Sequence, residues 1–187
     1  QYSHVWIDFR GIQDDWMRAH GIDYFENSRR ATHAQLGHAR ANPRGFKAYG
    51  DSVWGLTACD GPLDGGVVLH GRKRSFQTYT ARGASFDWTT DDGTVSPSAA
   101  GGSIPFVPRA TIFTLRQMAA RYGQHAYHRY GFVDALNPTL DVPMKTPAGH
   151  IVPGVGWFDH DQLGIDQGPI VTMIENFRSE LVWKTMR

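Results

Sequence analysis

The amino-acid sequence predicts an all-α domain with long loops between its helices. Three long segments have the residue spacing of an amphipathic helix, and residues that start or stop helices flank each of them. Two long loops, residues 49–100 and 137–161, contain many of the glycines and prolines. No internal repeat or linker divides residues 1–187, and a chain of this length can bury a sizeable core. We therefore expect one domain.

The first two long helices are defined by clear boundary signals. One is predicted from Asp23 to Ala41, since Asp23 and Glu26 have capping-box spacing and Pro43 follows the end. The other is predicted from Val107 to Tyr122, with Gly123 as its C-terminal stop. Apolar or aromatic side chains recur on one face of this second helix, at Ile112, Leu115, Ala119 and Tyr122.

The third long helix is predicted from Gln167 to Met186. Asp166 is its expected N-cap, and Pro169 is expected in the first turn, where a missing N–H has no cost. Glu175 and Arg178 should pair on its surface. Its buried face is predicted to carry Ile170, Met173, Ile174, Phe177 and Leu181.

Shorter elements are expected between these helices. Helical pieces are predicted at Ile12–Ala19 and His125–Tyr130. Residues 66–70 and 75–82 have enough β character for a small hairpin. Long loops are uncommon in compact domains unless they serve a function, so the two long loops are the first place to look for a site.

Composition excludes several function classes. There are 19 Lys and Arg against 18 Asp and Glu, with no basic block, so nucleic-acid binding has no electrostatic basis. No apolar run approaches the ~20 residues of a membrane-spanning helix. Cys59 is the single cysteine, and its sequence neighbours offer no cation to activate a thiolate, so it is predicted to be a small buried residue.

Motifs for other chemistries are absent from the sequence. Gly-x-Ser-x-Gly, Walker-type and HExxH patterns do not occur, and Asp159-His160-Asp161 lacks the spacing of a known metal motif. We therefore predict neither a metal nor a cofactor. The six Trp, seven Tyr and ten Phe suit carbohydrate binding, where rings stack on sugars, although aromatic residues also fill protein cores.

Dispersed sequence blocks resemble the bacterial glucoamylase-like family, which includes endo-β-1,2-glucanases. The blocks occur in the order that the family shows, across the whole chain. They are Gln1-Tyr-Ser-His-Val-Trp-Ile-Asp-Phe-Arg10, Asp23-Tyr-Phe-Glu-Asn-Ser28, Trp54-Gly-Leu-Thr-Ala-Cys-Asp-Gly61, Asp92-Gly-Thr-Val-Ser-Pro97, Ala100-Gly-Gly-Ser-Ile-Pro-Phe106, Tyr130-Gly-Phe-Val-Asp-Ala-Leu-Asn-Pro138 and Leu163-Gly-Ile-Asp-Gln-Gly-Pro169 with Met173-Ile-Glu-Asn-Phe-Arg178.

This resemblance implies the C-terminal half of an (α/α)6 toroid that hydrolyses a glucan. An inverting mechanism, a β-1,2-linked substrate and a monomer once the N-terminal half is present are implied with it. Family members are often exported, so a periplasmic or secreted location is expected. The chain departs from the family pattern in a Pro/Gly-rich insertion, Val142–Gly154, which would lie at the rim of the cleft. A non-catalytic carbohydrate-binding remnant and a transglycosylase remain open alternatives.

Glycoside hydrolysis requires carboxyl groups, and three aspartates are the candidates. Asp8 lies between apolar residues with Arg10 nearby, so a buried ion pair is the alternative to a catalytic role. Asp60 lies on a turn and has an Asx turn as its alternative. Asp166 follows a long loop and has N-capping as its alternative. We expect all three to converge at the mouth of the toroid.

Substrate contacts are expected from aromatic and polar residues of the same blocks. Trp54, Trp157 and Tyr130 are candidates for rings that stack on a saccharide. Hydroxyl groups of the sugar could be bound by His4, Arg10 and Glu26. Each has a structural alternative: packing for the rings, and for Glu26 the capping box or an ion pair with Arg29 or Arg30.

Overall fold

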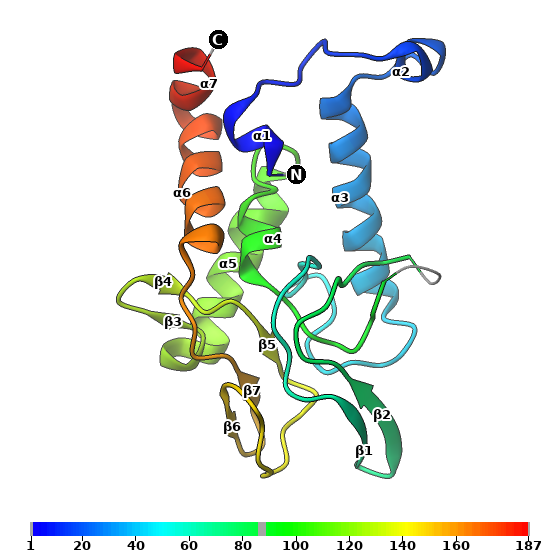
Figure 1. Cartoon of the computed structure of the whole chain (residues 1–187), viewed down its shortest axis with the longest axis vertical. Helices are drawn as coiled ribbons and strands as arrows, with labels where there is room; N and C mark the ends of the chain where they lie inside the picture. Colours follow the sequence, from blue (N-terminus) through cyan, green and yellow to red (C-terminus); the bar gives the residue numbers. More distant parts are fainter. Residues whose placement is uncertain (1, 86–88, 187) are drawn as a thin grey trace.

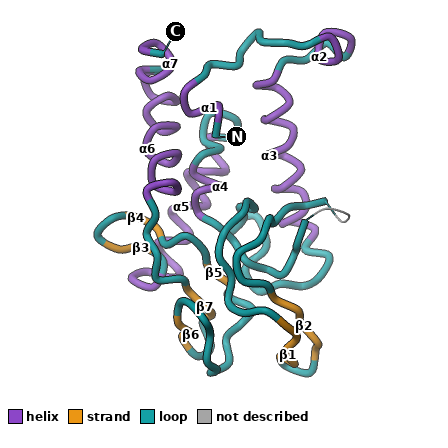
Figure 2. Tube along the Cα trace, in the orientation of Figure 1, coloured by secondary structure: helices purple, strands orange, loops and turns teal. Residues whose placement is uncertain are grey.

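The computed structural model describes residues 2–85 and 89–186. Figure 1 shows helices α3, α4, α5 and α6 in one part of the molecule, with the strands and long loops at one end of them. Figure 2 shows the same separation between helical and non-helical chain. The longest helices among the described residues are α3 (Tyr24–Ala41), α5 (Pro108–Tyr122) and α6 (Gly164–Ser179).

Helices α3 and α5 confirm the predicted boundaries to within one residue. The Asp23 carboxylate caps α3 by accepting a 2.7 Å hydrogen bond from the Glu26 N–H. Helix α5 ends at Gly123, which has a φ of 49° that most other residues adopt only with strain. Each signal depends on a residue at the helix end itself, and each has its predicted effect in the structure.

The closing helix differs from its prediction at both ends. Helix α6 begins at Gly164 after the N-cap Leu163, so the prediction of Asp166 as N-cap is wrong and Pro169 lies in the second turn. Glu180, with φ 60°, ends α6, and a separate short helix follows, α7 (Leu181–Thr185). Because Asp166 does not cap the helix, its carboxyl group is available for other contacts.

Short helices occupy the N-terminal region and the middle of the chain. They are α1 (Ser3–Trp6), α2 (Asp15–Ala19) and α4 (Pro97–Gly101), with a 3₁₀ turn at Gly123–His125. The predicted helix at 125–130 is wrong. Gly131, at φ 114°, instead closes a hairpin of β3 (Tyr127–His128) and β4 (Gly131–Phe132).

Small antiparallel sheets occupy the long loops, so the all-α prediction holds only for the larger elements. The predicted hairpin is present as β1 (Gly65–Leu69) and β2 (Arg72–Phe76). The bounds of its second strand were wrong, because β2 begins three residues before and ends six residues before the predicted 75–82. A three-stranded sheet has the order β5-β7-β6, formed by Leu136–Asn137, Gly156–Phe158 and His150–Val152. The Pro/Gly-rich insertion thus contributes β6.

Buried contacts between distant segments place the N-terminal residues beside the closing helix. The Asn176 amide donates a 2.9 Å hydrogen bond to the Val5 carbonyl, and the Trp183 indole donates a 2.7 Å bond to the His4 carbonyl. Gly101 of α4 packs directly on Ile170 of α6, since a Cβ at Gly101 would lie 2.7 Å from Ile170. Helix α4 therefore packs on the N-terminal half of α6, whereas α1 lies against its C-terminal end and α7.

None of the helices in the described ranges is both long and apolar enough to cross a membrane.

Candidate functional site

An acidic pocket of about 140 Å³ lies where the long loops meet the start of α6. Asp60, Asp134 and Asp166 come to it from three separate parts of the chain. No lysine or arginine is found among the described residues that line it. The lining is completed by Tyr2, Thr57, Ala58, Cys59, Tyr79, Leu163 and Ile165.

Asp166 lies in the first turn of α6, and one of its carboxyl oxygens forms no hydrogen bond. The residue is 4% exposed, and its Oδ2 atom has no hydrogen-bond partner. Burial raises the pKa of its carboxyl group, and side-chain hydrogen bonds with Ser98 and Asp134 oppose that shift. A carboxyl group kept from water in this way is suited to contact a ligand in the pocket.

Asp134 lies between β4 and β5, and the backbone fixes it on both sides. Its own N–H donates to the Asp161 carbonyl at 2.9 Å, while its Oδ2 accepts a 2.7 Å bond from the Asp60 N–H. Burial, with the charges of Asp166, Asp159 and Asp60, raises the pKa of Asp134 to about 7. The two carboxyl groups affect each other: the charge of Asp166 raises the pKa of Asp134, and the interaction with Asp134 opposes the rise in the pKa of Asp166.

Asp159 lies behind these acids and is completely buried. Its Oδ1 accepts the His160 N–H at 2.8 Å, its Oδ2 has no partner, and burial raises its pKa to about 6. Carboxylate oxygens of Asp60, Asp134 and Asp159 lie within 4.8 Å of one another, and so do ligand atoms of Asp159, His160 and Asp161. These are the described groups with oxygen or nitrogen atoms close enough to hold a cation.

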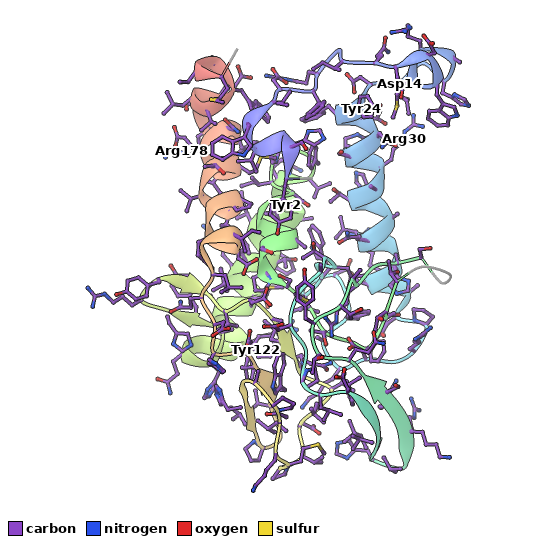
Figure 3. All side chains as sticks on the ribbon, in the orientation of Figure 1. Tyr2, Asp14, Tyr24, Arg30, Tyr122 and Arg178 are labelled. Carbon is purple, nitrogen blue, oxygen red and sulfur yellow. The ribbon has the colours of Figure 1, made fainter. Side chains whose placement is uncertain are left out.

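Two tyrosines form the exposed rim of the acidic pocket. Tyr2 is 46% exposed and Tyr79 is 70% exposed. Tyr2 lines the pocket together with the acids, where burial and the charge of Asp166 raise the pKa of its hydroxyl. Figure 3 shows Tyr2 beside α4, between α6 and α3. Exposed rings next to carboxyl groups can stack on a sugar while the acids bind its hydroxyls or transfer protons.

The structure brings together two of the three predicted acids, Asp60 and Asp166, and leaves out Asp8. The Asp8 carboxylate pairs with Arg10 at 2.8 Å, and Arg10 also contacts Glu180 at 2.8 Å, beyond the end of α6. Asp166 lies at the opposite end of α6, and sixteen helical residues span about 24 Å. The expected convergence of Asp8 with the other acids is wrong, and its ion-pair alternative is confirmed.

Sequence reasoning missed Asp134. The residue lies in the block Tyr130–Pro138, between Val133 and Ala135, where no amphipathic pattern accounts for an acid. The same criterion singled out Asp60, so the signal was available. What the sequence did not show is that the Asp60 backbone and the start of α6 meet at this aspartate.

The predicted tryptophan stacking surfaces are wrong. Trp54 is 1% exposed and Trp157 is fully buried in the middle strand β7, where its indole donates to the Ala148 carbonyl at 2.9 Å. Tyr130 is exposed on the β3–β4 turn, with the Arg129 guanidinium over its ring, and is outside the acidic pocket. Both indoles are therefore part of the hydrophobic core, because the small sheets and the helices pack around them.

The polar residues predicted to bind sugar hydroxyls lie outside the acidic pocket. His4 is buried, its Nε2 is 2.8 Å from the Ser28 hydroxyl, and burial lowers its pKa to about 4. Glu26 pairs with Arg29 and Arg30, whose hydrogen bonds lower its pKa to about 2. In Figure 3 Arg30 lies near the end of α3 that points away from the strands. The ion-pair alternative for Glu26 is therefore confirmed, and His4 packs in the protein interior.

Cys59 is buried, as predicted, and burial raises the pKa of its thiol. Its sequence neighbours carry no cation, but the fold brings the Arg82 guanidinium, from 23 residues further along the chain, to 3.5 Å from its sulfur. Burial outweighs this cation, so Cys59 is not an activated nucleophile.

Pockets that combine several buried carboxyl groups with an aromatic rim are typical of enzymes that act on saccharides. The chain belongs to the family described as "Putative glucoamylase", whose model matches residues 1–187. A putative glucoamylase from Bacteroides uniformis is 32% identical, with a TM-score of 0.74 over 99% of this chain. An endo-β-1,2-glucanase from Chitinophaga pinensis, solved with sophorotriose and glucose, is 29% identical over 99% of this chain, with a TM-score of 0.72.

A curated relative from Parabacteroides distasonis is an exo-β-1,2-glucooligosaccharide sophorohydrolase acting at the non-reducing end. It is 28% identical over 182 residues, which are 97% of this chain. The chain spans 20% of that protein, and 36% of the Bacteroides and Chitinophaga proteins.

Proposed function

We propose that this chain supplies the acidic face of the active site of a glycoside hydrolase that cleaves β-1,2-glucan or a related oligosaccharide. The observation that carries the proposal is the convergence of Asp60, Asp134 and Asp166 on one pocket. The helices around this pocket would form part of an (α/α)6 toroid, with the long loops over one end. Relatives that act on β-1,2-linked glucose support the choice of substrate.

In this proposal the Asp134–Asp166 pair holds the proton that the leaving oxygen needs. The pair has one proton to donate near neutral pH, because burial raises the pKa of both groups. Asp60 would bind a sugar hydroxyl or orient Asp134 through its N–H. The Tyr2 and Tyr79 rings would stack on the glucose ring.

An inverting mechanism also requires a second carboxylate, which activates a water molecule on the opposite face of the sugar ring from the acid. Inverting enzymes separate their two carboxyl groups by about 6.5–9.5 Å to leave room for water. Carboxylate oxygens of Asp60 and Asp134 lie within 4.8 Å of each other, which is too close for Asp60 to act as the partner of Asp134 in that arrangement. We therefore propose that at least one catalytic carboxylate belongs to another part of the full-length protein.

The test is hydrolysis by the full-length protein of oligosaccharides with β-1,2, β-1,3 and α-1,4 linkages. We expect reducing ends from the β-1,2 series, and NMR of fresh product should show the α anomer, the sign of inversion. A cooperatively folded protein that releases nothing from any glucan contradicts the proposal. Binding without turnover would indicate a carbohydrate-binding remnant, and products longer than the substrate would indicate a transglycosylase.

Tyr79→Ala is expected to weaken substrate binding without affecting the fold. The ring is 70% exposed, so its loss should leave thermal stability unchanged, while KM should rise about 5- to 10-fold for loss of stacking worth about 1 kcal/mol. Tyr130→Ala is the matched control, because Tyr130 is 68% exposed on a different turn. Equal KM values for the two variants would contradict a role for Tyr79 at the pocket.

A further inference from the structure

Arg82 is a buried arginine that lies behind the acidic pocket. It is 4% exposed and forms an ion pair with Asp92, with Nε and Nη2 each 3.0 Å from a carboxylate oxygen. Its remaining N–H groups donate to backbone carbonyls, those of Cys59 at 2.5 Å, Gln77 at 2.7 Å, Thr78 at 3.1 Å and Thr80 at 3.4 Å. A single guanidinium thus ties Asp92 to two separate backbone segments.

Both of these segments carry residues of the acidic pocket. Cys59 directly precedes Asp60, whose N–H in turn donates to Asp134. Gln77, Thr78 and Thr80 flank Tyr79, the exposed ring at the rim. The segments also pair with each other, since the N–H and carbonyl groups of Cys59 and Thr80 exchange hydrogen bonds of 3.3 Å.

Gly61 shows how closely the backbone approaches this guanidinium. A Cβ atom at position 61 would lie 2.2 Å from Arg82 Nη2 and 2.1 Å from the Gln77 carbonyl oxygen. Atoms do not approach this closely without a shift, so any side chain here would displace Arg82 or the Gln77 backbone. Glycine is therefore required by the position of Arg82.

We propose that Arg82 is a positioning residue that sets Asp60 and Tyr79 relative to each other and to the saccharide. This inference rests on the proposed function of the pocket. Arg82 forms no hydrogen bond with the side chain of Asp60 or Tyr79 among the bonds described above. It acts on both residues through the backbone carbonyls of Cys59, Gln77 and Thr78. The planar fork of arginine reaches Asp92 and both segments from three separate nitrogen atoms, whereas the donors of lysine all lie on one nitrogen atom.

Arg82→Lys in the full-length protein tests the inference. The charge beside Asp92 stays, but the carbonyls lose most of their donors, so we expect kcat/KM to fall about 30- to 100-fold, as for a misplacement of about 1 Å. Arg74→Lys is the matched control, because Arg74 also donates to two carbonyls, those of Arg44 and Gly45, away from the pocket. Equal kcat/KM values for the two variants would overturn the inference.

Gly61→Ala provides a second test if Arg82→Lys does not fold. It retains the arginine but forces its Nη2 away from the Gln77 carbonyl, so a similar loss of kcat/KM is expected. The pH–rate profile should move as well. Asp134 faces Asp166, Asp159 and Asp60. It would lose the hydrogen bond from the Asp60 N–H, which lowers its pKa, so the limb of the pH–rate profile that reports Asp134 should shift to higher pH. A profile identical to wild type would contradict positioning through Asp60.

Hydrogen–deuterium exchange separates this inference from the proposed function. In either variant, the Cys59 and Thr80 amides should exchange faster than in wild type, while amides of α5 should not change. Unchanged exchange at both amides would overturn the positioning role even if the enzyme is active. A wild-type protein without turnover would contradict the proposed function, and the exchange result would still decide whether Arg82 holds the two segments.

Discussion

Asp134→Asn is expected to lower kcat of the full-length protein by about 10²- to 10⁴-fold, the usual contribution of a general acid or base. Asparagine has nearly the same shape and can still accept the Asp60 N–H, so the pocket should keep its geometry. What it loses is the ionisable carboxyl group that supplies the proton in the proposed mechanism. Initial rates on β-1,2-gluco-oligosaccharides measure the loss, and a KM close to wild type would show that binding survives.

The same variant should be more stable than wild type at alkaline pH. The pKa of Asp134 is raised to about 7 in the folded protein, so the folded state binds more protons than the unfolded state from about pH 4 to pH 7. The stability that the Asp134 carboxyl group contributes is fully present below about pH 4, and it is lost as the pH rises through 7. Asparagine cannot ionise, so at pH 8 the gain should be on the order of 2–4 kcal/mol.

Urea unfolding at pH 4 and pH 8 measures this difference, with Asp161→Asn as the control. The Asp161 side chain is 46% exposed and lies close by on the same loop as Asp159, so its change should have little effect on rate or stability. Lower stability of Asp134→Asn at both pH values would mean that Asp134 has a structural role. An unchanged kcat would remove Asp134 from the proposed mechanism.

Asp92→Ala is expected to destabilise the fold by about 3–5 kcal/mol, because it leaves the buried Arg82 charge without its partner. Both side chains of this ion pair are 1% exposed. The Asp92 carboxylate also accepts the Gln77 N–H at 3.2 Å and the Thr94 N–H at 3.0 Å. The variant therefore loses an ion pair and two backbone hydrogen bonds at one site.

Denaturant midpoints measure this effect, and Glu175→Ala is the control. Glu175 and Arg178 form a surface pair at 3.3 Å, with the arginine side chain 71% exposed, so its loss should cost less than about 1 kcal/mol. A loss below that level for Asp92→Ala would show that the buried pair does not stabilise the fold. It would also weaken the case for Arg82 as a fixed anchor of the two pocket segments.

The long helices could be predicted because their signals are local. Asp23 caps α3 through its own side chain, and Gly123 ends α5 through its own backbone freedom. The three-stranded sheet could not be predicted in the same way. β5 (Leu136–Asn137) pairs with β7 (Gly156–Phe158), and nothing near either segment specifies its partner.

The candidate site was predicted in part. Asp60 and Asp166 stood out as acids in loop blocks, and both line the pocket. Asp8 met a similar criterion but pairs with Arg10 beyond the far end of α6. Trp54 had the residue type of a stacking surface but became part of the core. Residue type and local pattern identify a side chain as a candidate for the site. Its burial and its hydrogen-bond partners depend on the segments that pack around it.

The sequence by itself determined the family, the long helices and two of the acids, since each depends on residues close together in the chain or on the order of the blocks. Tertiary structure alone decided that Asp134 meets Asp60 and Asp166, and that Arg82 lies behind them. The physical reason is that the pKa of a carboxyl group and its use depend on burial and neighbouring charges. Both arise only when segments distant in the chain pack together.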